Sequence, residues 1–391
     1  MIDVIEVILI TTSFLSFITT LVLFGCYKLK KSKCKNSNDP TVSVFLPFYN
    51  ENEEHLIYAL NKLNDQNYPS QIQVIVIDDG STNNAISRVK EWIDNTEMNH
   101  DFQIIERPVN GGRKGFALDH VLDLGIATGE VYVVVDSDTY IDTNGIYELV
   151  IKLWSDEKYA AVCGYITPEN YKDSFIGKLQ HYEHISFYGA IRAAQDKLGC
   201  VPVLAGAFVA HRASVVNQLG GWSEWLVEDI AWCWKAISNG YRTGYAPRAK
   251  ATTQCPTDVK SLFNQRRRWA RGRVEAYTEA WKTHWIAGLC ASPWFLLTAA
   301  QYLFPSSIIL LGFMVAMGIW IPIVVAVANV FVYFLLVHSY IRDFDLSGEL
   351  SNRQVIKAPL YSALLESITW LPNLLGYSDE ILGKKKGWLT R

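Results

Sequence analysis

The sequence has no Cys-x-x-Cys pair, no internal repeat and no low-complexity tract. Its 7 cysteines are scattered and odd in number. This argues against a disulfide framework and against a zinc site, and it favours a reducing compartment around the main domain. The formal net charge is only -3, so the composition does not indicate a nucleic-acid partner. Positive charge is instead local, in two clusters, which are Lys28, Lys30, Lys31, Lys33 and Lys35, and Arg266, Arg267, Arg268, Arg271 and Arg273.

Long apolar runs are present, which predicts a multi-pass protein of the inner or plasma membrane. Residues 2–27 are apolar except for Asp3, Glu6 and hydroxyl residues, and about 20 apolar residues suffice to cross a bilayer. Lysines follow directly, so the positive-inside rule puts the start of the chain outside and the lysines in the cytoplasm. A cleaved signal peptide has its positive charge before the apolar run, and the residues before Cys26 fit a lipidation box poorly. We therefore predict an uncleaved transmembrane helix over residues 1–27.

The second apolar region, residues 293–341, contains very little charge. Gly318 and Pro322 interrupt it. We predict two transmembrane helices, over residues 295–318 and 320–341, joined by a tight turn. Two spans that follow a cytoplasmic domain return the chain to the cytoplasm.

The stretches on either side of this region are less apolar. Residues 358–376 contain Glu366 and two prolines, which permits either an interfacial segment or a third transmembrane helix. The lysine-rich tail, residues 377–391, prefers the cytoplasm and favours the interfacial alternative. Residues 256–292 are basic and aromatic, which is typical of amphipathic helices on a membrane surface, with a solvated basic helix as the other interpretation.

Residues 40–255 alternate between strand and helix patterns. This predicts a cytoplasmic α/β domain with a mostly parallel sheet and helices on both of its faces. The predicted strands cover residues 42–46, 72–77, 102–106, 131–135, 160–166 and 241–247. The predicted helices cover residues 53–66, 85–95, 116–127, 142–154, 175–197 and 230–239. Three of the strands end in polar or acidic loops, and such loops meet at one edge of a parallel sheet.

The strand over residues 131–135 ends in Asp136-Ser137-Asp138, at the carboxyl edge where open α/β sheets bind ligands. Two carboxylates so close repel each other, and a divalent cation relieves the repulsion. Oxygen ligands favour Mg²⁺ or Mn²⁺, and such ions commonly also bind substrate phosphates. A solvated turn is the alternative, because Asp and Ser favour turns.

Four motifs follow one another in the chain, namely Asp79, Asp136-x-Asp138, Glu228-Asp229 and Gln265-x-x-Arg268-Trp269. Their order resembles the D, D-x-D, E/D-D and Q-x-x-R-W motifs of the processive family-2 glycosyltransferases, membrane enzymes that build cellulose, chitin, hyaluronan and poly-N-acetylglucosamine. Within that family, residues 222–273 look most like the bacterial poly-β-1,6-N-acetylglucosamine synthases. The resemblance implies a GT-A fold, a Rossmann-like nucleotide-diphospho-sugar transferase domain, inserted between transmembrane helices.

The resemblance also implies roles for single residues. Asp138 is the more direct metal ligand and Asp136 the second, while Asp229 is the general base and Glu228 supports it or binds the acceptor. Donor binding is implied for Pro47, Tyr49, Glu51, Asp79, Gly80, Lys114, Asp136, Gln265 and Arg268. Acceptor binding is implied for Gly206, Glu228 and Trp269.

These roles suit transfer from a sugar nucleotide. Breaking the glycosidic bond builds negative charge on the diphosphate, which a metal ion and the cations Lys114 and Arg268 would stabilise. The acceptor hydroxyl is a poor nucleophile and needs a base such as Asp229, and covalent attack by Asp229 is the other route. Trp269 offers an aromatic face to a sugar, although membrane anchoring explains the two arginines just before Arg268 well.

We therefore expect an inverting, metal-dependent membrane glycosyltransferase that uses a UDP-sugar, with UDP-N-acetylglucosamine as the best choice, to elongate and export a β-linked polysaccharide. One alternative is transfer of a single sugar to a lipid acceptor, as in ceramide glucosyltransferases. Another class, a transporter or scaffold that merely binds nucleotide, gives no reason for Asp229 and the Q-x-x-R-W motif to occur together. The few predicted spans make a thin channel, so we also expect a small membrane partner subunit or a homo-oligomer.

Overall fold

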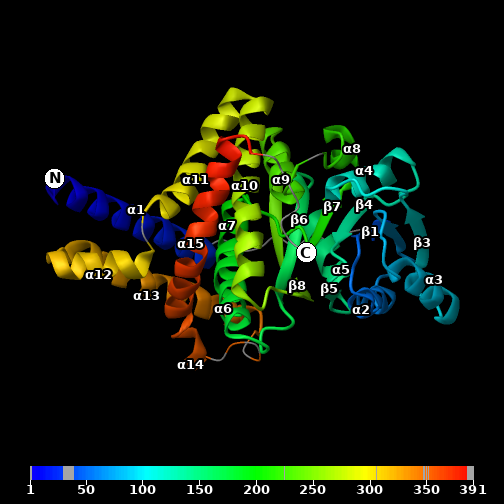
Figure 1. Ribbon diagram of the computed structural model, residues 1–391, viewed down its shortest axis with the longest axis horizontal. Coiled ribbons are helices and arrows are strands. Elements are labelled where there is room, and N and C mark those ends of the chain that lie inside the picture. The colour runs from blue at the N-terminus through cyan, green and yellow to red at the C-terminus, as the bar shows by residue number, and fades with distance from the viewer. Residues whose placement is uncertain are drawn as a thin grey trace.

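The computed structural model describes residues 2–29, 39–223, 225–304, 306–346, 348, 350 and 352–384. At its centre is an eight-stranded sheet with the strand order β3-β2-β1-β4-β7-β6-β8-β5 (Figure 1). The strands are β1 (Val42–Phe48), β2 (Gln73–Asp78), β3 (Asp101–Glu106), β4 (Val131–Val135), β5 (Thr139–Ile141), β6 (Tyr159–Pro168), β7 (Phe208–Arg212) and β8 (Arg242–Thr253). Outside the described residues lie Lys30, Lys31, Lys33 and Lys35 and positions 385–391 of the predicted tail.

Strands β1 to β4 form a parallel half of the sheet, as predicted. Alternate residues of β1 belong to different hydrophobic clusters, since Phe45 packs on one face while Val44 and Leu46 pack on the other. A strand that is apolar on both sides must be covered on both sides. The helices that connect these strands are α2 (Glu53–Asn64), α3 (Ala85–Asn95) and α4 (Lys114–Asp123).

The other half of the sheet is mixed. β7 is antiparallel to both β4 and β6, β6 is parallel to β8, and the short β5 is antiparallel to β8. Its helical segments are α5 (Gly145–Trp154), α6 (Phe175–Glu183), the π-helix η1 (His184–Ile191), α7 (Arg192–Leu198), α8 (Ala213–Leu219) and α9 (Glu228–Ser238). Because β7 returns beside β4, the N–H of Asp136 donates to the carbonyl of Ala207 (3.1 Å). The residues before β7 thus lie next to the Asp-x-Asp turn.

Several predicted elements differ from the structure in bounds or continuity, among them the predicted helix over residues 142–154, which begins at Gly145. The predicted helix over residues 175–197 is interrupted by η1, where hydrogen bonds change from the i−4 to the i−5 carbonyl for a few residues. The predicted strand over residues 241–247 continues to Thr253. The predicted helix over residues 116–127 begins earlier, at Lys114.

Apolar helices extend from one side of the sheet (Figure 1). In the described part of the chain, two helices are long and apolar enough to cross a membrane, Val4–Leu29 within α1 (Ile2–Leu29) and α13 (Trp320–Asp343). The span predicted over residues 295–318 stays a prediction, because this stretch consists of two helices with a bend between them. α11 (Trp285–Leu303) and α12 (Ser307–Met317) are bent by 67° at the break between them, and they amount to a third span only as a bent pair. The sequence has a proline at position 305, and proline cannot donate a helical hydrogen bond.

Helices α1 and α13 run in the same direction. The side-chain amide of Asn329 donates to the Ser16 hydroxyl (3.0 Å), and the Tyr27 hydroxyl donates to Asp343 Oδ2 (2.9 Å). Lys197 of α7 donates to the main-chain oxygen of Tyr27 (2.8 Å). The carboxyl ends of both helices are therefore fixed to the sheet domain.

Helices α10 (Val259–Thr283) and α15 (Ala358–Ile381) pack against each other and run crosswise to α1 and α13 (Figure 1). Gly376 of α15 allows the close approach, because a Cβ atom there would lie 2.4 Å from the carbonyl oxygen of Arg267. The short α14 (Asn352–Val355) precedes α15. Among the described helices, α15 is not one of those apolar enough to cross a membrane, and its location at the interface stays a prediction.

Candidate active site

The side chain of Lys114, the first residue of α4, connects three separate segments at the carboxyl edge of the sheet. Its Nζ donates to Asp136 Oδ1 (2.6 Å) and to the carbonyl of Gly206 (3.0 Å), and it lies 3.3 Å from Glu228 Oε1. Burial lowers the pKa of Lys114, but the carboxylates of Asp136 and Glu228 raise it more, so the ammonium stays charged. A fixed positive charge therefore lies between the D-x-D and E-D motifs.

Asp229 is held by two main-chain donors. The N–H of Gly206 donates to Oδ2 (2.8 Å) and the N–H of Ile230 donates to Oδ1 (2.8 Å). A Cβ atom at Gly206 would lie 2.7 Å from Oδ2, so this contact requires glycine. Burial and the charge of Glu228 raise the pKa of Asp229 to about 6, and Lys114 opposes the rise. A carboxylate with this pKa suits general-base catalysis near neutral pH, while the acceptor contact expected of Gly206 stays a prediction.

The Asp-x-Asp turn presents two carboxylates on one side. Asp136 and Asp138 are partly exposed, whereas Ser137 between them is buried and donates to Glu51 Oε2 (2.6 Å). The N–H of Thr139 donates to the carbonyl of Asp136 (3.0 Å) and closes the turn, which leaves both carboxylates partly exposed at the edge of the sheet. Thr253 Oγ1 lies 3.4 Å from Asp138 Oδ1.

The donor set fits a hard divalent cation. No group of three or more His, Cys, Asp or Glu residues suited to a metal is found in the part of the chain that the structure describes. Mg²⁺ and similar ions are commonly held by one or two carboxylates together with substrate phosphates and water. Asp136 and Asp138 would supply the two carboxylates, and the donor diphosphate would supply further oxygens.

Asp79 follows β2 and is tied to the loop after β3. It forms an ion pair with Arg107, accepts a hydrogen bond from the Asn110 amide (3.0 Å) and lies 3.3 Å from the main-chain N of Gly111. Burial raises the pKa of Asp79, and Arg107 opposes the rise. Gly80 has φ +75°, and a Cβ atom there would lie 2.7 Å from the N of Asn110, so this turn requires glycine. The sequence reasoning missed Arg107, whose position directly after β3 places it at the same edge.

The residues predicted near the nucleotide base lie at the end of β1, between β2 and β4. Pro47 pairs with Ile77 across the parallel ladder, and Tyr49 at the rim is 44% exposed. Glu51 is buried beneath the Asp-x-Asp turn and accepts from Ser137. Glu51 therefore supports the turn, and its contact with the nucleotide stays a prediction.

Helix α10 packs against the segment that leads into Glu228. Glu275 of α10 accepts hydrogen bonds from the N–H groups of Leu226 (2.9 Å) and Val227 (3.3 Å). A Cβ atom at Gly272 would lie 2.4 Å from the Val227 side chain. Positions 265 and 268 recur with 272 and 275 at helical spacing, so the Q-x-x-R-W motif lies on the face of α10 turned toward this segment.

Gln265, Arg268 and Trp269 of the motif are partly buried. Gln265 Oε1 is buried and has no hydrogen-bond partner among the described residues, so it can accept a hydrogen bond from a substrate or from water. Trp269 lies edge-on to Tyr188 with ring centroids 6.4 Å apart, and the Arg266 guanidinium lies 4.5 Å from the Trp269 ring centre. The roles of Gln265, Arg268 and Trp269 in donor and acceptor binding stay predictions.

The two arginines inside the motif are bound within the protein, so their interpretation as membrane anchors is wrong. Arg266 donates twice to the carboxylate of Glu183 (3.0 and 2.6 Å), and Arg267 donates to Asp379 Oδ2 (2.6 Å). These partners are 83 and 112 positions away in the sequence, a separation that no helical or strand periodicity reports. Sequence reasoning therefore missed both acidic residues.

A parallel-to-mixed sheet with an Asp-x-Asp turn at its carboxyl edge and a second acidic pair beside a buried lysine defines a glycosyltransferase. Residues 132–337, more than half of the chain, match the model described as "Glycosyl transferase family group 2", and residues 43–220 match "Glycosyl transferase family 2". The chain belongs to the family 2 glycosyltransferases.

Similar proteins include two curated poly-β-1,6-N-acetyl-D-glucosamine synthases. The one from Staphylococcus epidermidis is 31% identical over 246 residues, which cover 62% of this chain and 57% of the relative. The one from Staphylococcus aureus (strain COL) is 31% identical over 253 residues, which cover 64% and 58%. The matched region thus spans less than two thirds of the length of these relatives.

A solved structure resembles nearly the whole chain. It is a mannosyltransferase from Pyrobaculum calidifontis in complex with GDP-Man and Mn²⁺, with a TM-score of 0.65, 20% sequence identity, and coverage of 97% of this chain and 99% of the other. This likeness confirms the predicted GT-A fold, with apolar helices at both ends of the chain.

Proposed function

We propose that the protein is an inverting, metal-dependent membrane glycosyltransferase that transfers N-acetylglucosamine from UDP-N-acetylglucosamine to a growing β-linked polysaccharide and exports the product. The main support is the contact of Lys114 with both Asp136 and Glu228, which joins the donor and acceptor motifs in one charged network. The sugar is proposed from the similarity to the poly-β-1,6-N-acetyl-D-glucosamine synthases.

On the donor side, Asp136 and Asp138 would hold Mg²⁺ or Mn²⁺, which when bound neutralises charge on the diphosphate. Lys114 adds a preorganised positive charge that needs no rearrangement as the glycosidic bond breaks, and Arg268 of α10 would add another. Asp79, with the adjoining glycine turn and the rim of β1, would orient the nucleotide.

On the acceptor side, Asp229 would take the proton of the acceptor hydroxyl. The oxygen then forms a bond to the anomeric carbon while the bond to the diphosphate breaks, and UDP leaves with the bonding electrons. One such displacement inverts an α-linked donor to a β-linked product. The two N–H groups that hold Asp229 fix its direction, and Trp269 would stack on the acceptor sugar.

We further propose that the domain over residues 40–255 lies in the cytoplasm. Helices α1 and α13 are parallel and reach the sheet domain from the same side, as two spans that enter the cytoplasm would. Helices α10 and α15 would lie in the interface, crosswise to them (Figure 1). A small membrane subunit or a second copy of this chain would complete the export path.

The test uses the purified full chain in lipid nanodiscs with Mg²⁺ or Mn²⁺. UDP-GlcNAc, UDP-Glc, UDP-GlcA and GDP-Man are offered separately, and nucleotide release and product size are followed. A polymer from UDP-GlcNAc alone is expected. A single glycolipid formed with added lipid acceptors would replace polymer synthesis by single transfer, and nucleotide binding without any transfer would overturn the proposal.

A further inference from the structure

Helix α10 is wedged between two packed neighbours. On one side Gly272 and Glu275 contact the segment that leads into Glu228 and Asp229. On the other side Gly376 of α15 approaches the α10 backbone so closely that a Cβ atom would overlap with it. A shift of α10 would therefore move the Q-x-x-R-W motif relative to the general base.

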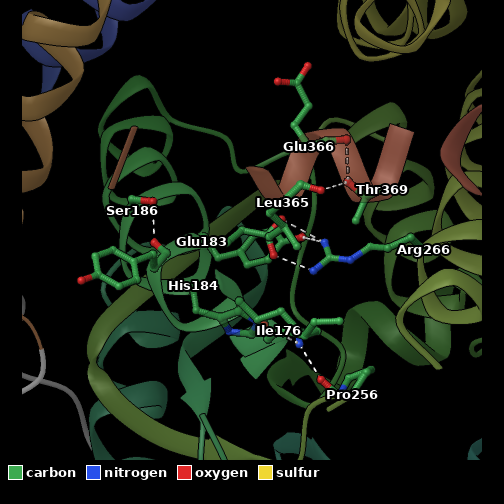
Figure 2. A network of polar contacts seen from close by, with 12 residues as sticks. Ile176, Glu183, His184, Ser186, Pro256, Arg266, Leu365, Glu366 and Thr369 are labelled. Atoms are coloured by element: carbon green, nitrogen blue, oxygen red, sulfur yellow. Dashed lines mark hydrogen bonds and ion pairs between the residues drawn. The ribbon is translucent and has the colours of Figure 1, made fainter. Parts of the chain in front are cut away.

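One carboxylate that fixes α10 comes from the end of α6. Figure 2 shows Arg266 pointing from α10 to Glu183, with Leu365 and Thr369 of α15 close by. The Arg266 side chain is only 4% exposed, and its guanidinium also donates to the Tyr188 hydroxyl (2.9 Å). A two-point arginine–carboxylate contact sets orientation as well as distance. Glu183 therefore fixes the position of α10 along its axis and its rotation about that axis.

The second carboxylate comes from the end of α15. Asp379 is almost fully buried. Its Oδ2 accepts a hydrogen bond from Arg267 Nε (2.6 Å), and its Oδ1 forms an ion pair with Lys384 Nζ (2.8 Å). One turn along α10, Arg271 donates to Glu380 (2.9 Å). Successive arginines of α10 thus reach different neighbours, Arg266 to α6 and Arg267 with Arg271 to α15.

We propose that Glu183 and Asp379 are positioning residues for glycosyl transfer, which clamp Arg266 and Arg267 from two sides and thereby hold Gln265, Arg268 and Trp269 in place against Glu228 and Asp229. The proposal rests on the proposed function and assigns the consecutive arginines separate tasks. Arg266 and Arg267 fix the helix, and Arg268 serves the substrate. Misplacement of reacting groups by about 1 Å can cost about 100-fold in rate, so loss of either carboxylate is expected to slow transfer.

The experiment compares Glu183→Gln and Asp379→Asn, which keep side-chain shape and remove the charge, with the corresponding alanine variants. Each full-length variant is measured in nanodiscs for kcat, for acceptor KM and for binding of UDP with Mn²⁺. We expect kcat to fall about tenfold in the amide variants and about 100-fold in the alanine variants. UDP affinity should fall less than kcat, since Asp79 and Asp136 are held by the sheet and only Gln265 and Arg268 of the donor-binding residues lie on α10.

A matched control is the Lys152–Asp196 pair (2.7 Å), which is similarly buried but joins α5 to α7. Asp196→Asn should lower the melting temperature as much as Asp379→Asn while kcat stays unchanged. Each amide variant is also combined with Trp269→Ala, where the clamp should matter less because one of the three residues that it positions is gone.

Folded amide variants with wild-type kcat, or losses that simply multiply with that of Trp269→Ala, would overturn the clamp and leave the proposed function standing. A wild-type chain that transfers sugar from none of the donors would instead overturn the proposed function. If the alanine variants fail to fold, the amide variants alone still test the proposed clamp.

Discussion

The two halves of the active site are built by different means. On the nucleotide side, Asp79 and Asp136 follow β2 and β4, which both pair with β1, so the ladder hydrogen bonds set their spacing. On the acceptor side, Trp269 belongs to α10, which contacts its neighbours through ion pairs such as that of Arg266 with Glu183. The strand ends are thus placed by the sheet ladder, whereas α10 is tied to its neighbours by ion pairs that are remote in the sequence.

The largest effect is expected at the acceptor half, from Asp229→Asn. The amide cannot accept the hydroxyl proton, so transfer should fall on the order of 1000-fold, while UDP binding, which depends on the sheet half, stays unchanged. Initial rates and titration calorimetry measure the two quantities. Asp123→Asn, an exposed carboxylate at the end of α4, serves as the control, and substantial turnover by the Asp229 variant would remove it as the base.

The nucleotide side of the active site is disrupted most directly by Asp138→Ala. Loss of a metal ligand should weaken Mn²⁺-dependent binding of the UDP-sugar by on the order of 100-fold, and transfer should fall with it. Asp142→Ala, four positions further along and exposed, should bind normally. Full affinity in the Asp138 variant, with the metal still required, would contradict its assignment as a ligand.

Lys114 belongs to both halves, so its removal tests how they are joined. Lys114→Met should lower the rate about 30-fold through loss of positive charge at the diphosphate. In the unaltered enzyme the rate should rise with pH through about 6, because burial and Glu228 raise the pKa of Asp229 to that value and the base must be deprotonated. Lys114 lowers that pKa, so in the variant the acidic limb of the pH–rate profile should move upward. An acidic limb at the same pH in the variant would contradict the electrostatic effect of Lys114 on Asp229.

The smallest effect is expected from Trp269→Ala. Loss of the aromatic face should raise the acceptor KM about tenfold and leave hydrolysis of the donor without acceptor unchanged. Trp281→Ala, on the same helix and 41% exposed, is the matched control. Equal loss of both activities would point instead to a disturbed helix.

The same contrast explains what the sequence predicted. Strand β4 and its Asp-x-Asp turn were predictable because a run of β-branched residues indicates a buried strand. The acidic residues that follow indicate where that strand ends. The order of the four motifs likewise predicted that Asp136, Glu228 and Asp229 would meet, and the structure brings them together around Lys114.

The helical contacts had no comparable signal. Glu183 and Asp379 pair with α10 across long sequence separations, so no local pattern links them to it. For Arg266 and Arg267, composition offered only membrane anchoring, although Arg266 is buried. The antiparallel β7, which brings Gly206 to Asp229, could not be distinguished from a further parallel strand because apolar composition does not encode strand direction.

The parallel pairing of α1 with α13 has a consequence for biosynthesis. Tyr27 emerges from the ribosome early, but its hydrogen-bond partner Asp343 follows 316 positions later, and Asn329 reaches Ser16 only at the same late stage. The entire sheet domain is therefore made while the first helix still lacks its companion. Docking of α13 is therefore a late step of assembly, followed by that of α15, and chains that stop before it leave the first helix as a target for quality control.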